Sequence, residues 1–435
     1  MKTLFLIILS IAFAIGNVQS QTLLTETTWG GVGSDVADGV ASAADGSSYV
    51  VGITDSFTTD PFGTPSPKIF VVKFAPDGSL TWQKIWNGTT IRGLGRPDVA
   101  VSADGSVYVT GVTAENGGDA VLLKFDANGA LLWERIWGGP ASDQGFAVAT
   151  APDGAIYIAG TATSFGPSSA GLFVVKFDSA GNLVWQRISD GAAGNAVAVA
   201  PDGSIYAAGT TPRNDIGEFD MVVLKIEAAG DLVWQRTYSA GEVVDPRGRM
   251  ATGSDGSIVI AGAIQAPRHQ FVDIAALIVK VTSDGALVFD KQFAGRVSET
   301  GDGVAVAADN TIYVAGTTTS FGAGFQDAFM LHVQSTGKKI LDAVTWGGPG
   351  FETGAGVAVS GGTVMLAATT QTGPPYSLLP ASAKLSAPRG TLAAVDGVLS
   401  NVAGVVADLA AGTTTPDGST TFSGNFEAAL VRIAR

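Results

Sequence analysis

The chain has 435 residues, a formal net charge of −14 at pH 7 and no cysteine. The absence of cysteine excludes disulfides and cysteine-ligated zinc. The acidity argues against a nucleic-acid partner, whose affinity depends on neutralising phosphates, and against anionic membranes. The same charge is typical of a protein that must stay soluble outside the cell.

Residues 1–20 predict a secretory signal peptide. Lys2 provides a positive start, an apolar run over residues 4–15 is interrupted only by Ser10, and Ser20 is a small residue at the expected cleavage position. The run is shorter than the roughly 20 apolar residues that a membrane span needs, and no later stretch approaches that length. We therefore expect residues 21–435 to form one exported domain in the periplasm, at the cell surface or in the extracellular space, with no membrane span.

A sequence motif that occurs eight times divides residues 21–435 into repeats. Its clearest copy is the sequence APDGAIYIAG at residues 151–160. Repeats of about 40–50 residues with four short strands each are typical of the blades of a β-propeller. The aligned turn positions are Asp45, Asp104, Asp153, Asp202, Asp255, Asp309 and Gly361, with a degenerate eighth copy near Val405.

Each repeat predicts four antiparallel strands. A small, apolar innermost strand such as residues 196–200 is followed by an Asp-Gly turn, which is a strong hairpin signature, and by a second strand at 204–209. The third strand, for example residues 119–125, is almost continuously apolar and is therefore expected to be buried on both faces.

The outer strand of each repeat alternates apolar and polar residues. In one copy Leu131, Trp133, Arg135 and Trp137 fall on the same face. A cation between two aromatic rings is compatible with a ligand site. We interpret it instead as scaffold, because a cation at a blade edge blocks edge-to-edge pairing and stacks on neighbouring rings.

The two ends of the chain predict how the ring closes. The last repeat supplies short strands near residues 409–412 and 428–433 but no outer strand, whereas residues 23–31 form an orphan strand that ends in Trp-Gly-Gly, as do residues 137–139 and 346–348. We expect these segments to share one blade. The predicted fold is an all-β, closed, eight-bladed β-propeller of four-stranded antiparallel blades, with seven blades as the alternative if residues 391–409 are irregular.

The repeats resemble the secreted bacterial β-propeller repeats often called SBBP repeats. The matching phrase runs from Trp-Gly-Gly through Asp-Gly-x-Ile-Tyr-Val-Ala-Gly-Thr-Thr, and residues 160–166 and 316–322 carry it well. The resemblance covers nearly all of residues 21–435 and implies an exported or cell-surface repeat scaffold. The outer strands depart from it, with Trp-Gln-Arg-x-Trp in place of that family's Tyr-Ser-Thr-Tyr.

Residues 126–133, DANGALLW, are similar to the tryptophan-docking phrase of quinoprotein propellers and of related outer-membrane assembly scaffolds. The resemblance implies a vicinal cysteine pair and a calcium site in the quinone-dependent enzymes of that type. This chain has no cysteine and no Asp-x-Asp-x-Asp-Gly loop. The sequence therefore favours a noncatalytic scaffold, and we expect no cofactor and no metal.

The long, irregular loops all fall on one face of the predicted propeller, where function usually concentrates. They hold basic residues, which we predict to bind an anionic ligand, either an acidic glycan or the carboxylates of a partner protein, through forked hydrogen bonds. The alternative is that each arginine pairs with a loop acid among Asp215, Glu218, Asp245, Asp273 and Glu299. The predicted ligand-binding residues are Arg92, Arg96, Arg213, Arg247, Arg249, Arg268, His269 and Arg296.

Catalysis has few candidates in this sequence. His269, in a long loop beside Arg268, is the candidate acid–base group, whereas His332 lies in an apolar strand and is expected to be packed. No Gly-x-Ser-x-Gly elbow, His-Glu-x-x-His helix or phosphate loop occurs. Carboxylates near the expected channel mouth suit glycoside chemistry, hydrogen bonding to backbone or loose Ca²⁺ binding. They are Asp35, Asp38, Asp98, Asp143, Glu299, Asp302 and Glu352.

These observations lead to one prediction of function and one alternative. The prediction is a monomeric, exported, noncatalytic binding or structural module. The alternative is a propeller lyase or hydrolase that acts on an anionic polysaccharide. An enzyme would gather its acids, His269 and the arginines into one cleft, whereas a scaffold would disperse them or pair them with each other.

Overall fold

The computed structural model describes most of the predicted domain. The predicted signal peptide, residues 1–20, lies outside the described residues. The described residues are 23–57, 66–91, 95–114, 117–168, 170–213, 218–240, 244–245, 249–268, 271–371, 376–378, 385–386, 391–395, 400–401, 405–407, 413–414 and 427–434.

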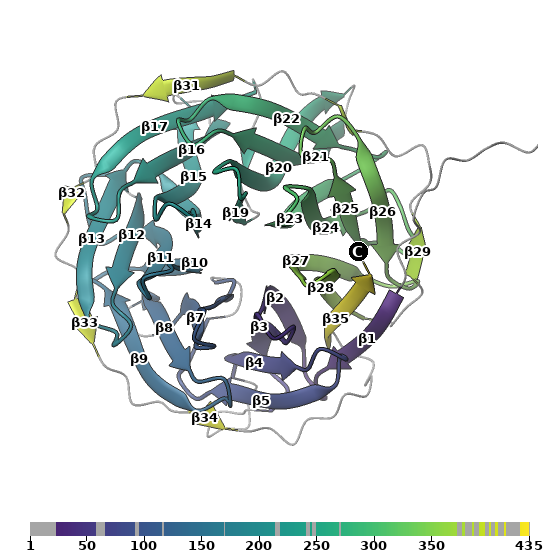
Figure 1. The fold of residues 1–435 in the computed structure, drawn as a ribbon, viewed down its shortest axis with the longest axis horizontal. Helices are drawn as coiled ribbons and strands as arrows, with labels where there is room; N and C mark the ends of the chain where they lie inside the picture. The colour runs from purple at the N-terminus through teal and green to yellow at the C-terminus, as the bar shows by residue number, and fades with distance from the viewer. Residues whose placement is uncertain are drawn as a thin grey trace, which may run out of the picture.

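The strands in these ranges form seven antiparallel sheets arranged as blades around a central axis (Figure 1). Blade 1 contains β2 (Asp35–Ser42), β3 (Ser48–Thr54), β4 (Lys68–Phe74) and β5 (Leu80–Trp86). Blade 2 contains β6 (Asp98–Val101), β7 (Val107–Val112), β8 (Ala120–Phe125) and β9 (Leu131–Gly138). Blade 3 contains β10 (Asp143–Thr150), β11 (Ile156–Ala162), β12 (Gly171–Phe177) and β13 (Leu183–Asp190).

Blades 4 to 6 continue this order. Blade 4 contains β14 (Ala193–Val199), β15 (Ile205–Arg213), β16 (Glu218–Ile226) and β17 (Leu232–Ser239). In blade 5 the short strands β18 (Val244–Asp245) and β19 (Met250–Thr252) both pair with β20 (Ile258–Arg268), followed by β21 (Phe271–Val281) and β22 (Leu287–Phe293). Blade 6 contains β23 (Glu299–Val306), β24 (Ile312–Thr318), β25 (Asp327–Val333) and β26 (Ile340–Trp346).

Blade 7 joins the two ends of the chain. It contains β27 (Glu352–Ser360), β28 (Thr363–Thr370), β35 (Glu427–Ala434) and, outermost, β1 (Leu23–Trp29). Strand β1 pairs antiparallel with β35, with Thr27 opposite Leu430. The predicted closure of the ring by the N-terminal strand is confirmed. The short strand predicted near residues 409–412 lies outside the described residues.

The preferred prediction of eight blades is wrong, and the seven-blade alternative is confirmed. In the described residues the degenerate copy near Val405 contributes β33 (Val405–Ala407), and this strand pairs with the outer strand β9 of blade 2. The described strands between residues 376 and 414 contain two to five residues each. Strands this short extend existing sheets and do not form a blade of their own.

These short strands form a belt around the ring, visible as the yellow and yellow-green arrows on the outer rim in Figure 1. Each described belt strand pairs antiparallel with the outer strand of a different blade, passing from blade 6 back to blade 1. The belt strands are β29 (Tyr376–Leu378) on β26, β30 (Leu385–Ser386) on β22, β31 (Thr391–Val395) on β17, β32 (Ser400–Asn401) on β13, β33 on β9 and β34 (Thr413–Thr414) on β5.

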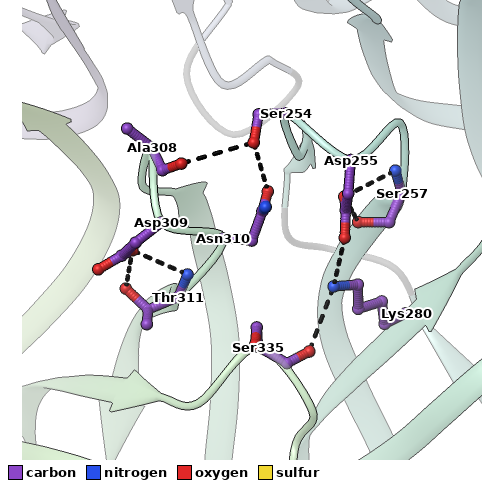
Figure 2. Close-up of polar contacts among 9 residues, drawn as sticks. All are labelled: Ser254, Asp255, Ser257, Lys280, Ala308, Asp309, Asn310, Thr311 and Ser335. Atoms are coloured by element: carbon purple, nitrogen blue, oxygen red, sulfur yellow. Dashed lines mark hydrogen bonds and ion pairs between the residues drawn. The ribbon is translucent and has the colours of Figure 1, made fainter.

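The turns between the two inner strands form as the Asp-Gly pattern predicts. Gly154 has a φ of 83°, and Asp153 Oδ1 accepts a hydrogen bond from the Ala155 backbone at 3.0 Å. Figure 2 shows the equivalent turns of blades 5 and 6, where Asp255 and Asp309 accept bonds from the residue two positions later. Because the left-handed region favours glycine and then asparagine, Asn310 tolerates its φ of 62° in the blade 6 turn.

Neighbouring blades are joined by a repeated lysine contact. Lys124 Nζ lies 5.3 Å from the ring centre of Tyr108 and donates a 2.9 Å hydrogen bond to the carbonyl of Ser179 in the next blade. Lys280 repeats the hydrogen bond, without the tyrosine ring, between blades 5 and 6, donating to the carbonyl of Ser335 at 3.2 Å (Figure 2). In blade 6 His332 takes the place of the lysine and stacks on Tyr313 with ring centroids 4.2 Å apart, which confirms that it is a packed residue.

The aromatic and cationic residues of the outer strands also belong to the scaffold. Trp185 Nε1 donates to the carbonyl of Ala228 in the next blade at 3.0 Å, and the guanidinium of Arg187 lies 5.5 Å from the Trp185 ring. Arg187 Nε donates to the Gly230 carbonyl at 2.9 Å. The third strand β8 is buried along its whole length, as predicted. The contacts of Arg187 confirm the predicted stacking of the outer-strand cations on neighbouring rings. The predicted blocking of edge-to-edge pairing is wrong, because the belt strands pair with the outer strands at these very residues, for example Arg187 with Asn401.

Candidate functional site

A cavity of about 790 Å³ lies at the ring axis and receives residues from every blade. Most of its wall comes from the beginnings of the innermost strands. Because these strands start just after the loops from the preceding outer strands, the cavity lies at the long-loop end of the propeller. Representative lining residues, one from each blade in order, are Asp38, Arg96, Gln144, Asn195, Arg249, Asp302 and Thr353.

A β-bulge explains how an otherwise regular strand places a side chain in the cavity. In five of the described innermost strands the register with the second strand shifts by one residue at an equivalent position. A bulged residue is unpaired and is aimed differently from its neighbours. The residues at the five shifts are Asp38, Phe146, Asn195, Asp302 and Ala355, and all of them line the cavity.

Arg249 crosses the axis from blade 5 and is held by blades 1 and 2. Its Nη1 atom forms an ion pair with Asp98 Oδ1, and its Nη2 atom donates to the carbonyls of Asp38 at 2.7 Å and Pro97 at 3.2 Å. Burial lowers the pKa of Arg249 to about 10; the charge of Asp38 opposes that shift and the charge of Arg96 adds to it. The guanidinium is still charged at neutral pH and ties three blades together.

A second ion pair crosses the axis in the same cavity. Arg96 Nη1 of blade 2 lies 3.4 Å from Asp302 Oδ1 of blade 6. The Arg96 side chain is 56% exposed, whereas that of Asp302 is 8% exposed. Thr300 Oγ1 donates to the other oxygen of Asp302 at 2.7 Å, which fixes the carboxylate on the wall. Arg96 therefore presents its guanidinium to the cavity.

The carboxylates at the very start of the innermost strands have a structural role. Asp143 Oδ2 accepts from the Gly139 backbone at 2.7 Å, and its Oδ1 accepts from the backbones of Thr163 and Ser164 at 3.0 Å each. Asp35, Glu299 and Glu352 likewise accept from a glycine backbone in the preceding loop, and they also accept from the hydroxyl of the threonine that ends the second strand. These bonds hold the two loops together in blades 1, 3, 6 and 7.

Arg213 and Arg296, the other predicted residues whose side chains the structure describes, do not line the cavity. Arg213 Nη1 pairs with Glu218 Oε2 at 3.0 Å and Arg213 also pairs with Asp220, as the alternative interpretation expected. Arg296 is exposed, and its backbone N–H donates to Ser320 Oγ at 2.7 Å. Arg268 ends strand β20. Arg92, Arg247 and His269 lie outside the described residues.

Sequence reasoning missed the uncharged polar wall of the cavity and an aromatic pair beside it. Gln144, Asn195 and Gln326 line the cavity. Phe325 and Phe351, in adjacent loops of blades 6 and 7, stack with ring centroids 5.5 Å apart and ring planes 13° apart. The bulge positions could have been predicted from the sequence, because they are the positions at which the aligned innermost strands differ most.

In the described part of the chain no group of three or more histidine, aspartate or glutamate side chains is arranged to hold a metal ion. No helix among the described residues is long and apolar enough to cross a membrane.

The ring of antiparallel four-stranded blades defines this protein as a β-propeller. No family model matches the chain, so the resemblance to SBBP repeats stays a prediction. The chain is similar to the regulatory protein FlaEY of Caulobacter vibrioides, with 29% identity over 101 residues, which are 20% of this chain. The match spans only 11% of that relative's length.

Two solved structures are similar to this chain at the level of overall shape. A protein of unknown function from Dyadobacter fermentans matches with 10% identity over 96% of this chain and 99% of that chain, at a TM-score of 0.47. The Dos1 propeller matches with 8% identity over 80% of this chain and 93% of that chain, at a TM-score of 0.44. The propeller assignment rests on the strand pairings of this chain itself.

Proposed function

We propose that this β-propeller is a noncatalytic binding module that works outside the cell and takes its ligand into the axial cavity. The observation that carries the proposal is the set of bulges that direct variable side chains from five blades into one space. Bulges that re-aim a side chain are common next to functional sites. A volume of about 790 Å³ lies within the usual range of ligand sites.

The arrangement of charges supports binding over catalysis. Arg249 is paired with Asp98, and Arg96 with Asp302. The carboxylates that start the innermost strands accept hydrogen bonds that hold neighbouring loops together; they are Asp35, Asp143, Glu299 and Glu352. An enzyme of the predicted alternative kind needs a carboxyl pair or a histidine with a free proton-transfer role. The described residues instead show carboxylates in structural contacts, which is what a scaffold requires.

Export and the nature of the partner are part of the proposal. The apolar run at residues 4–15 and the resemblance to SBBP repeats support secretion to the cell surface or the extracellular space. We propose that the module acts as a monomer. The anionic ligand predicted from the loop arginines stays one candidate class, since Arg96 exposes its guanidinium. The same guanidinium can donate hydrogen bonds to a neutral ligand.

The test is a binding screen of the protein lacking residues 1–20, with a matched pair of variants. The panel contains neutral oligosaccharides, acidic oligosaccharides and peptides, and both binding and release of products are measured. Asn195→Trp fills the cavity, whereas Leu132→Trp places the same bulk on the outer strand β9, where Leu132 is 52% exposed.

We expect at least one panel member to bind the parent protein and Leu132→Trp with similar affinity. The same panel member should not bind Asn195→Trp. A ligand bound equally well by Asn195→Trp would overturn the assignment of the cavity, as would a panel in which nothing binds. Release of products from any panel member would overturn the noncatalytic assignment.

A further inference from the structure

Two phenylalanines form an exposed platform on the long-loop face. Phe325 is 73% exposed and Phe351 is 45% exposed. Their rings are nearly parallel, so Phe351 supports one side of the pair and Phe325 offers an open ring face to solvent. Single exposed apolar residues are ordinary on a soluble protein, whereas two stacked exposed rings beside a cavity form a flat apolar surface that a ligand in the cavity can contact.

The platform is continuous with the wall of the axial cavity. The Phe325 backbone N–H donates to the carbonyl of Gly350 at 3.1 Å, and Glu352 donates to the carbonyl of Gln326 at 2.9 Å. These two bonds hold the loops of blades 6 and 7 side by side. Gln326, the next residue after Phe325, lines the cavity, and so does Thr353, two positions after Phe351.

The balance of charge at the described part of the cavity indicates the class of ligand. Arg96 and Arg249 are the two guanidinium groups there, and they face the carboxylates of Asp38, Asp98 and Asp302. The local excess is therefore one negative charge, which disfavours a polyanion. The rest of the polar wall is made of neutral amides and hydroxyls, which can both donate and accept hydrogen bonds.

We propose that the ligand is a neutral oligosaccharide, with one sugar ring stacked on Phe325 and the adjoining hydroxyls inside the cavity. A pyranose ring has an apolar face of C–H groups, which suits the electron-rich face of an aromatic ring. Its hydroxyls each donate and accept, and the wall contains the amides of Gln144, Asn195 and Gln326, which also donate and accept. This inference rests on the proposed function and names the ligand class of the same cavity.

The test compares neutral with acidic oligosaccharides by isothermal titration calorimetry on the protein lacking residues 1–20. The neutral probes are cellohexaose, maltohexaose, xylohexaose and mannohexaose, and the acidic probes are hexagalacturonate and hexamannuronate. Phe325→Ala and Phe351→Ala remove the platform. Phe325→Tyr keeps an aromatic face, and Phe219→Ala removes a ring that is 39% exposed on blade 4.

We expect one neutral probe to bind, with its affinity reduced about tenfold by Phe325→Ala or Phe351→Ala, since losing such a stacking contact removes roughly one order of magnitude. Phe325→Tyr and Phe219→Ala should bind like the parent protein, and added salt should leave the affinity unchanged. Equal binding by Phe325→Ala would overturn the inference, whether or not the melting temperature has changed.

The outcomes separate this inference from the proposed function. If only an acidic probe or a peptide binds, and Asn195→Trp abolishes that binding, the saccharide inference fails and the proposed function stands. If the affinity of a neutral probe depends on Phe325 but is the same for Asn195→Trp as for the parent protein, the cavity is not the site and the proposed function fails. If no probe binds, both fail.

Discussion

The seam between blades 7 and 1 gives the sharpest test of how the ring closes. Trp29, at the end of β1, is 1% exposed, and its ring centroid lies 4.5 Å from that of Phe70 and 5.3 Å from that of Phe57. Its Nε1 atom donates to Gln83 Oε1 at 2.5 Å. Phe70 and Gln83 both belong to blade 1, so Trp29 joins the two ends of the ring.

Trp29→Ala should therefore destabilise the whole propeller. Truncating a buried tryptophan costs about 3–5 kcal/mol. Loss of the side-chain hydrogen bond adds about 1 kcal/mol. We expect the free energy of unfolding, measured by urea denaturation with circular dichroism, to fall by about 4–6 kcal/mol.

Trp137→Ala is the matched control, because Trp137 has the same environment at a seam that the chain crosses continuously. It is 1% exposed, its ring centroid lies 4.3 Å from that of Phe173, and its Nε1 atom donates to Gln186 Oε1 at 2.7 Å. If the ring is closed, both variants should lose similar stability, and removal of residues 21–31 should cost more than either. A loss below about 1 kcal/mol for Trp29→Ala, beside a full loss for Trp137→Ala, would refute closure by β1.

The remaining predictions concern a close backbone approach and the response to acid. A Cβ at Gly160 would lie 1.8 Å from the carbonyl oxygen of Gln144, so Gly160→Ala should cost about 1–3 kcal/mol or more in urea denaturation. Gly203→Ala, where a Cβ meets nothing within 4 Å at a φ of 83°, should cost less, and the reverse order would contradict this packing. Hydrogen bonds from Ser102 and Ser106 lower the pKa of Asp104. Its contribution is therefore complete above the unfolded pKa of about 3.9 and is lost as the pH falls through the lower folded pKa. Asp104→Ala should reduce the acid-induced drop in the urea midpoint, and an unchanged acid profile would count against this role.

The belt gives the ring a form of edge protection that no outer strand supplies by itself. An open sheet edge presents unpaired backbone groups to other chains. Strand β31 occupies this edge along residues Gln235 to Ser239 of blade 4, and the other belt strands do the same over shorter stretches. In blade 7 the N-terminal strand β1 is itself the outermost strand of the sheet.

Much of the scaffold was predictable because its patterns are local. The Asp-Gly turn at residues 153–154, the buried third strand β8 and the alternating outer strand β9 all follow from turn chemistry and from the period of two. The closing role of β1 was also predictable, since the last repeat lacked an outer strand and residues 23–31 matched one.

The number of blades and the candidate site were not predictable in the same way. The eight-blade prediction counts residues 391–409 as part of a blade, but the hydrogen-bond partners of residues 391–395 lie in β17, more than 150 residues earlier in the chain. The loop arginines read as one basic patch, yet Arg213 pairs within its own hairpin while Arg96 and Arg249 pair across the axis. Pairings of this kind depend on which segments meet in space.

The sequence by itself determined the repeat, the four strands of each blade, their buried faces and the strand that closes the ring. The repeat, its strands and their buried faces depend on side-chain alternation and turn residues within a few tens of positions. The closing strand is found by comparing residues 23–31 with the outer strands of the other repeats. Only the tertiary structure decided that seven blades close the ring, that the segment before the last strand encircles it, and that the bulged residues Asp38, Asn195 and Asp302 share one cavity. A bulge in one strand becomes part of a site only when ring closure brings the innermost strands of all the blades to a common axis.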